Sequence, residues 1–521
     1  MRNLIKNINR GILHFAFLIL PLALLASCFS DNTSIADMTS LSYISPVDSV
    51  AVDSVYDIYQ NEKVTIHPHM MQTRPEKGLK LSYEWEVSGK TVSTDSVFTY
   101  TGTELGSFSC RLIVSNDDGS VFYPFIINVV TPYEEGITVL STKEDGGSCL
   151  SFMRMNAADQ TETYFYDDEL FSLNNPDVTF SPNAVDMIHT ENSLYIMCQG
   201  DDDHAPAIYN LQHKTLKMKN YINVTGYSDF KPTILALPGK PYPGNYYPVV
   251  CENGKTYDFG SENAVGRATK LKYTYAQKVV MFDSRTSNYF YSIFWDTDIN
   301  ALCQLYTGYG PFYCGNTYNC PRDSVRSNPS DCNYFNGENF VTMVPVQVAK
   351  EQSSVQDPDV LVFTKRALGP ITNVKRTVIN YAFWVYNDEN ETVLGITNPI
   401  SLCGTYAPGK PLPFDTSTAM VASKKYNKLF YANGNKLMSW NYVSDNLSKA
   451  TTLMTAGTTS TCQIKALMLS NDHERIYVSF YDPEQSGKNG SLWVIKTDGG
   501  EVLERYDNVF YKPVKMLYKD K

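Results

Sequence analysis

The sequence of 521 residues predicts an all-β protein in two parts, a small two-sheet domain followed by a β-propeller. Three observations support this prediction. Short runs of alternating apolar and polar residues fill residues 46–131. A unit of about 47 residues, a length typical of propeller blades, recurs over residues 135–521. Tyrosine is abundant, with 37 residues, while charged residues make up only 19%, a composition that suits β-sheet.

Residues 1–27 have the layout of an export signal. Three basic residues come first: Arg2, Lys6 and Arg10. The apolar stretch that follows, residues 12–25, is shorter than the about 20 residues that a membrane-spanning helix needs. The segment "LASC" at 25–28, which begins with the last residue of this stretch, resembles the cleavage box of bacterial lipoproteins. This resemblance implies that the thiol of Cys28 is acylated. An ordinary cleaved signal, with Cys28 unmodified, is the alternative.

Residues 28–45 are predicted to form a lipid-anchored linker. The polar stretch "FSDNTS" after Cys28 is typical of a flexible tether. It also resembles the acidic export tag of Bacteroidetes surface lipoproteins, although it has one acid, Asp31, where the tag usually has two. The resemblance implies a location in the outer membrane, lipid-anchored and facing the cell exterior.

Five strands are predicted within residues 46–131, the first domain. They are "VTIHPHM", "LSYEWEV", "SVFTYTG", "GSFSCRLIVSNDDGS" and "FYPFIINVV". In the fourth run, residues 108, 110, 112 and 114 are apolar and fall on one face, and residues 116–119 supply a hairpin turn. Trp85 is placed as a core tryptophan on a middle strand of a sandwich.

Two of these runs resemble a known family. "YEWEVSGK" and "GSFSCRLIVSNDDG" follow the Y-x-W and G-x-Y-x-V-x-L-x-V-x-N-x-x-G patterns of PKD domains, with Phe108 and Cys110 as departures. A PKD domain is an immunoglobulin-like sandwich. Next to a lipid anchor it resembles the PKD-like lipoproteins of Bacteroidetes, which accompany SusC/SusD-type outer-membrane importers. The resemblance implies a spacer domain beside such a TonB-dependent importer, and a sandwich that binds ligand itself is the alternative.

The repeat of residues 135–521 is marked by methionines in short apolar runs. They are Met187, Met281, Met420, Met468 and Met516, and Ile234 takes the place of a sixth. The gaps between the methionines are 94, 139, 48 and 48 residues, close to multiples of the unit. Each unit has four strands, which predicts a radial array of antiparallel sheets. A β-sandwich array or a β-helix is the alternative.

The strand around Met516 has no blade of its own after it, so it is predicted to complete the first blade, which begins near residues 136–142. We predict seven blades. Eight is the alternative, because the interval 281–420 contains long insertions.

Charge and motifs exclude several function classes. Removal of residues 1–27 takes away three basic residues and no acidic one, so the net charge of −11 becomes −14. With no basic tract, nucleic acid is not expected as a partner. H-E-x-x-H, G-x-S-x-G and P-loop motifs are absent. His67 and His69 are expected at the surface, and "DDDH" at 201–204 and "DTDIN" at 296–300 are expected to be solvated turns rather than calcium loops. We therefore predict no metal and no cofactor.

Two aromatic, Gly/Pro-rich loops at 241–248 and 306–320 are the predicted ligand surface, because exposed rings stack on sugars or peptide side chains. Their rings are Tyr242, Tyr246, Tyr247, Tyr306, Tyr309, Phe312, Tyr313 and Tyr318. The first loop follows the first strand of one blade and the second follows the third strand of the next, so both are expected on one face of the ring. Rings that cover the small core of their own loop are the alternative.

The cysteines after residue 28 form two groups. Cys303, Cys314, Cys320 and Cys332 cluster in loop-like sequence and are disulfide candidates that would restrain the second aromatic loop. Buried thiols in strand-like runs are expected for the others that stand alone: Cys110, Cys149, Cys198, Cys251 and Cys462.

The sequence therefore predicts a non-enzymatic outer-membrane surface lipoprotein that captures a nutrient, glycan or oligopeptide, beside a SusC/SusD-type importer. Its predicted parts are a signal peptide, 1–27; a linker, 28–45; a PKD-like sandwich, 46–131; and a β-propeller, 135–521. A propeller-fold glycoside hydrolase or lyase is one alternative, since paired carboxylates can come from distant blades. A structural docking subunit of the import complex is the other.

Overall fold

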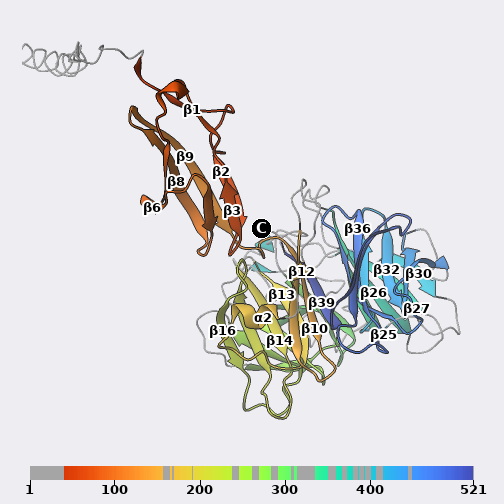
Figure 1. Cartoon of the computed structure of the whole chain (residues 1–521). Coiled ribbons are helices and arrows are strands. Elements are labelled where there is room, and N and C mark those ends of the chain that lie inside the picture. The colour runs from red at the N-terminus through yellow and green to blue at the C-terminus, as the bar shows by residue number, and fades with distance from the viewer. Residues whose placement is uncertain are drawn as a thin grey trace, which may run out of the picture. The chain divides into compact units, whose positions relative to one another are not determined.

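The computed structural model divides the chain into two compact units, residues 1–131 and 132–521, each described by itself (Figure 1). It describes residues 40–155, 165–166, 169–190, 192–237, 246–260, 269–282, 291–306, 310–313, 335–349, 359–366, 372–378, 385–386, 392–393, 401–406, 415–443 and 449–519. The predicted signal peptide and Cys28 lie outside these residues. Within the described part of the chain, no helix combines the length and the apolar character that crossing a membrane requires.

The first unit consists of two main sheets around one core. The larger sheet has the order β2 (Val55–Tyr59), β9 (Gly119–Val130), β8 (Gly106–Asn116), β5 (Ser82–Val87) and β6 (Lys90–Ser93). The smaller pairs β3 (Lys63–Ile66) with β7 (Phe98–Thr101), and β1 (Ile44–Pro46) pairs with β4 (Met70–Gln72). Trp85 of β5 is fully buried and stacks on Phe98 of the smaller sheet, with ring centroids 4.7 Å apart.

The predicted faces of β8 agree with the structure. Cys110, Leu112 and Val114 are buried in the core that contains Trp85, and Phe108 packs against it partly buried. The β8–β9 hairpin turns at residues 116–119, where the Asn116 side-chain oxygen accepts hydrogen bonds from the backbone N–H groups of Asp118 and Gly119.

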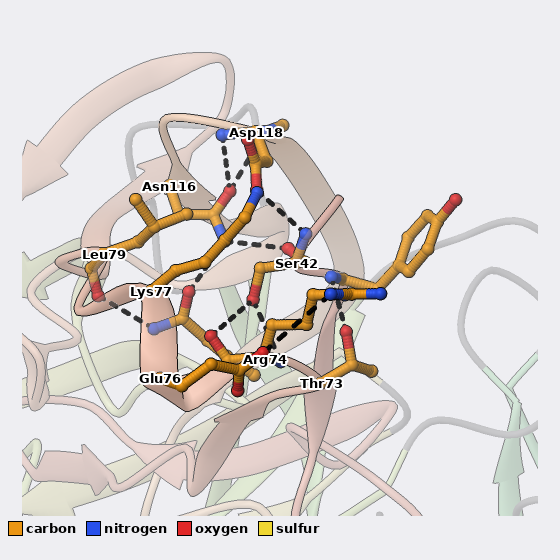
Figure 2. A network of polar contacts seen from close by, with 11 residues as sticks. Ser42, Thr73, Arg74, Glu76, Lys77, Leu79, Asn116 and Asp118 are labelled. Atoms are coloured by element: carbon orange, nitrogen blue, oxygen red, sulfur yellow. Dashed lines mark hydrogen bonds and ion pairs between the residues drawn. The ribbon is translucent and has the colours of Figure 1, made fainter. Parts of the chain in front are cut away.

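A polar network fixes the chain where it enters this unit (Figure 2). The Ser42 N–H donates to the Asp118 carboxylate at 2.8 Å, and the Asn116 amide donates to the Ser42 carbonyl at 2.9 Å. Lys77, in the short 3-10 helix η2 (Pro75–Lys77), donates to the same Asp118 carboxylate at 2.6 Å. The pKa of Asp118 lies below its ordinary value, mainly because Lys77 donates this hydrogen bond. The network ties Ser42, near the end of the predicted linker, to the β8–β9 hairpin.

The second unit repeats a four-stranded antiparallel arrangement. In four of the groups the strands follow in sequence order: β13 (Ala184–His189), β14 (Ser193–Cys198), β15 (Ala207–Gln212) and β16 (Met218–Asn223); β17 (Pro232–Leu235), β18 (Tyr246–Cys251), β19 (Lys255–Gly260) and β20 (Thr269–Thr274); β21 (Val280–Phe282), β22 (Tyr291–Asp296), β23 (Ala301–Tyr306) and β24 (Gly310–Tyr313); and β35 (Gln463–Leu469), β36 (Arg475–Tyr481), β37 (Gly490–Lys496) and β38 (Val502–Phe510).

Two further groups are joined by a short parallel pairing of their first strands at Val346–Ala422 and Gln347–Ser423. They are β25 (Glu338–Gln347), β26 (Asp359–Arg366), β27 (Thr372–Val378) and β30 (Ser401–Tyr406); and β31 (Met420–Ser423), β32 (Lys428–Asn433), β33 (Lys436–Asn441) and β34 (Thr451–Thr455). We call each four-stranded group a blade and name it by its first strand.

The C-terminal strand closes the ring. β39 (Lys512–Lys519) pairs antiparallel with β10 (Gly136–Thr142), which continues to β11 (Ser148–Arg154) and β12 (Phe165–Tyr166). β39 also contacts β13 on one side and β35 on the other. First strands meet in the same way between β13 and β17, β21 and β25, and β31 and β35, while the β17 and β21 blades share a core. The first strands thus form the inner ring of a β-propeller.

The sequence markers of the repeat all fall on first strands, as predicted. Met187 is on β13, Ile234 on β17, Met281 on β21, Met420 on β31, Met468 on β35 and Met516 on β39. The prediction that the Met516 strand completes the blade that begins at 136–142 is confirmed by its pairing with β10.

Candidate functional site

The aromatic loops are only partly described. Tyr242, Tyr309 and Tyr318 lie outside the described residues. Tyr246 begins β18 and Tyr306 ends β23, so the two loops leave a first and a third strand, as predicted, at the end of the ring where first strands finish. Phe312 and Tyr313 lie on β24, which runs antiparallel to β23, so they belong to a strand and not to a loop.

Tyr247 does not belong to an exposed ligand surface, which corrects the prediction. Its side chain is only 7% exposed, and its ring packs 4.6 Å from Tyr195 and 5.0 Å from Phe259. These residues belong to the core shared by the β13 and β17 blades. The ring of Tyr247 therefore holds two blades together and has no free face for a ligand.

The predicted disulfide cluster remains a prediction. Cys303 is fully buried on β23 opposite Phe294, while Cys314, Cys320 and Cys332 lie outside the described residues. The cysteines expected as buried thiols are all buried: Cys110, Cys149, Cys198, Cys251 and Cys462. Burial raises the pKa of both Cys198 and Cys251 to about 12, so these thiols are poor nucleophiles.

The acidic loop at 201–204 is an exposed turn closed on itself. One oxygen of Asp201 accepts from the backbone N–H groups of Asp203 and His204 and lies 2.8 Å from the His204 ring. In the described part of the chain, no group of three His, Cys, Asp or Glu side chains is placed to hold a metal ion. His67 and His69 are exposed on the first unit, as expected.

Charged side chains gather instead at the opposite end of the ring, where the first strands begin. We call this set the basic cluster: Lys278, Lys465, Lys512, Lys515, Asp186 and Asp415. Lys515 of β39 pairs with Asp186 of β13 at 2.5 Å, and the second oxygen of Asp186 accepts from the Leu235 N–H at 2.7 Å. One buried carboxylate therefore links three blades.

β-Bulges place part of this cluster. Each of five first strands has one extra residue near its start, and these residues are Val185, Thr233, Val341, Lys465 and Val514. A bulge turns the local side chains away from strict alternation. Lys465 is itself a bulge residue, and Asp186 and Lys515 each follow one.

Lys278 adds the β21 blade to the cluster. The pKa of Lys278 is lowered to about 8, mainly by burial and then by the charge of Lys515. Asp415 and Asp186 act in the opposite direction. Lys278 precedes β21, and the β13 and β17 blades separate the β21 blade from β39. Lys278 and Lys515 therefore come from blades that are not neighbours, at the same end of the ring, and the charge of Lys515 helps to lower the pKa of Lys278.

Lys465 and Lys512 are held side by side on one aromatic ring. Each ammonium lies 5.7 Å from the centroid of Tyr481, within the range of a cation–π contact. Burial and then Lys512 lower the pKa of Lys465, and Asp415 opposes them. The Asp415 carboxylate accepts hydrogen bonds from Ser417 and Thr418, which form a turn with it. The bond from the Ser417 hydroxyl contributes most to lowering the pKa of Asp415.

The cluster carries a local positive excess in an acidic chain. It holds four lysines against two aspartates, and a third carboxylate at this end, Asp482 after Tyr481, accepts from Thr459 and Thr461; the whole chain has a net charge of −11. Lys278, Lys465 and Lys512 form no ion pair with another described residue, while Lys515 does. Like-charged side chains that are held close together despite their repulsion, and whose pKa values are shifted, are typical of functional sites. The arrangement can hold an anion.

The cluster could not be predicted from the sequence, because its residues come from positions 186 to 515 and meet only through ring closure. A signal was present: Lys278 and Lys465 each stand three residues before a repeat-marking methionine, in "KVVM" and "KALM". Each lysine alone looks like a solvated surface residue.

Comparison with known proteins gives fold likeness only. No family model and no curated protein matches the chain. A quinoprotein alcohol dehydrogenase-like protein of Bacteroides thetaiotaomicron is 15% identical, with 92% of this chain and 99% of that chain covered and a TM-score of 0.43. A protein provisionally assigned as a 6-phosphogluconolactonase of Bacteroides fragilis is 10% identical, with coverages of 74% and 98% and a TM-score of 0.40. The β-propeller domain of Swd1 from Myceliophteria thermophila is 9% identical, with coverages of 62% and 89% and a TM-score of 0.31. At such scores the fold description rests on the strand pairing alone.

Proposed function

We propose that this protein is a non-enzymatic surface lipoprotein of the outer membrane that captures a nutrient, glycan or oligopeptide, beside a SusC/SusD-type importer. Cys28 carries the lipid, residues 46–131 form a PKD-like immunoglobulin-like spacer, and a seven-bladed propeller binds the ligand. The lipid anchor and the importer partner rest on the sequence resemblances. Seven blades are supported by the described strands of the second unit, which form seven four-stranded groups and one separate pair, β28 (Val385–Tyr386) with β29 (Thr392–Val393).

The observation that carries the capture function is the basic cluster. It brings charged groups from several blades to one end of a closed ring, on strands whose backbones are fixed by pairing. Binding to a site that is already in place avoids part of the cost of ordering side chains. Rigid placement of uncompensated charge supports recognition of a ligand.

Binding is favoured over hydrolysis by the state of the carboxylates. Asp186 is engaged by Lys515 and the Leu235 N–H, and the pKa of Asp415 is lowered. A general acid for glycoside hydrolysis needs a raised pKa. Burial raises the pKa of Asp258 to about 6, but Asp258 lies on β19, the third strand of its blade, away from the inner ring.

A retention experiment tests this function. The mature chain without its lipid, residues 29–521, is applied to an array of glycans and oligopeptides, together with a Lys278→Met/Lys465→Met variant. A Lys496→Met variant is the matched control, because Lys496 is an exposed lysine at the far end of β37. We expect the wild type and the control to retain the same ligand and the double variant to lose it. Equal retention by all three proteins, or appearance of cleaved products, would contradict the proposal.

Docking by the first unit is a second candidate function. Val55, Phe122 and Ile126 are exposed on one face of the larger sheet, where Val55 lies directly beside Ile126. An exposed apolar face of this kind suits contact with another protein. A Phe122→Asp variant that keeps ligand retention but loses co-purification with an importer would assign docking to this face.

A further inference from the structure

We propose that the basic cluster binds an oligosaccharide bearing uronic-acid carboxylates. This inference rests on the proposed capture function and adds to it the chemical class of the ligand. It stands on the positions of the lysines, on the way they are held, and on the side chains that surround them.

The spacing of the lysines favours a ligand with several separated anionic groups. Lys465 of the β35 blade and Lys512 of β39 both lie at the ring of Tyr481, whereas Lys278 comes from the β21 blade, so the cluster offers positive charge at two separate places. Among the described residues that form the cluster there is no arginine, whose planar fork would suit one phosphate or one carboxylate held in a fixed geometry. Lysines act as point charges, and several of them along a surface match carboxylates spaced along an acidic sugar chain.

The lysines are held in place before a ligand arrives. Lys465 and Lys512 share the ring of Tyr481, whose hydroxyl donates to Gln463 at 3.4 Å. Lys515 is fixed by its 2.5 Å pair with Asp186. Because these side chains lose little freedom on binding, more of the electrostatic attraction remains as affinity.

The surroundings favour a saccharide over an acidic peptide. Hydroxyl and amide side chains lie at the same end of the ring, on or just before first strands: Thr233, Gln277, Ser417, Thr418 and Thr459. Each is held by a hydrogen bond within the protein, and a hydroxyl that donates one bond can still accept another from a sugar. Tyr227, 39% exposed, lies in the connection that leads into β17 and offers an aromatic ring at this end. A peptide would need apolar pockets for its side chains, and the other exposed large apolar residues described in this unit lie away from first strands: Leu173, Tyr221, Val443 and Leu503.

Titration calorimetry with the mature chain tests the ligand class. The probes are oligosaccharides of galacturonate, mannuronate and alternating glucuronate, a neutral oligogalactan of matched length, and oligoglutamate. We expect at least one uronate probe to bind, with affinity falling as salt is raised, and no measurable binding of the neutral probe. Lys278→Met and Lys465→Met should each weaken binding about tenfold or more, while Lys496→Met should change it less than about twofold.

A pH series adds a readout specific to Lys278. Its charge is set by burial and by Lys515, Asp415 and Asp186, and its pKa is about 8. Because only the protonated amine attracts a carboxylate, affinity should fall between pH 7 and pH 9 in the wild type and stay nearly constant in Lys278→Met. Melting temperatures of the variants establish that each is folded.

The outcomes separate this inference from the proposed function. Tighter binding of oligoglutamate than of every uronate probe would make the ligand an acidic peptide and overturn the inference, while capture would stand. Retention of neutral glycans with unchanged affinity in the lysine variants would have the same consequence. Binding of none of these probes, together with no retention on the array, would overturn both.

Discussion

Ring closure by the C-terminal strand is the architectural feature on which the position of the basic cluster depends, and Met516 is the residue through which to test it. Met516 is 5% exposed and packs in a core with Ile137, Val139 and Leu492, which come from two different blades. Met516→Ala removes this contact and leaves the backbone pairing of β39 with β10 in place. Removal of residues 512–521 takes away the pairing as well.

The magnitudes follow from burial and pairing. A buried methionine replaced by alanine costs about 2–5 kcal/mol of unfolding free energy. Deletion of β39 adds the loss of a ladder of seven residue pairs with β10, at roughly 1 kcal/mol for each hydrogen bond lost. The sum approaches the about 5–15 kcal/mol of a whole domain. We therefore expect Met516→Ala to be folded but less stable and the deletion variant to be unfolded or aggregated.

Urea unfolding followed by tryptophan fluorescence and circular dichroism measures both variants. Leu503→Ala is the control, because Leu503 is 43% exposed on the outer strand β38, and it should change the unfolding free energy by less than about 0.5 kcal/mol. A deletion variant with the midpoint of the wild type would refute closure by this strand, and a Met516→Ala variant as stable as Leu503→Ala would refute its burial between blades.

Three further predictions concern other parts of the chain. Cys28→Ala should abolish acylation and move the protein from the membrane to the soluble fraction, and palmitate labelling that persists would contradict the lipoprotein assignment. His473, buried 2.8 Å from the Ser423 hydroxyl, has its pKa lowered to about 4 by burial and then by a neighbouring lysine, so stability is present above pH 6.5 and is lost as pH falls toward 4. Urea unfolding should show that the second unit is about 2 kcal/mol less stable at pH 4.5 than at pH 7 because of His473. His473→Gln should remove that part of the difference. Asn116→Ala should lower the stability of the first unit by about 1–3 kcal/mol, because the hairpin and the Ser42 carbonyl lose the Asn116 side-chain amide as a hydrogen-bond partner. Asp117→Ala, at an exposed position, is the control and should change the stability little. Equal effects of the two variants would contradict the role of the network.

The repeat could be predicted from sequence because inner strands share a local pattern. Each carries an apolar residue that packs in or against a core between blades, so Met187, Ile234 and Met516 recur at regular spacing. The β25 blade was not assigned its own marker, because Met343 lies between insertions of unequal length and breaks the spacing. The pattern therefore predicted the ring and left the number of blades open.

The site could not be predicted in the same way. An aromatic residue at a loop boundary is compatible with a ligand surface or with a core, and pairing with β19 places Tyr247 in the core between blades. The basic cluster brings together residues of blades that are not neighbours, such as Lys278 and Lys515, which are 237 positions apart in the sequence. Local sequence has no information about which residues meet there until the ring is closed.

The most direct test of capture by the basic cluster is a crystal structure of the mature chain with the saccharide that it retains. We expect carboxylates of the ligand beside Lys278 and Lys465, at the end of the ring where the first strands begin. A ligand bound at the opposite end, against the loops at 241–248 and 306–320, or on the first unit, would contradict it.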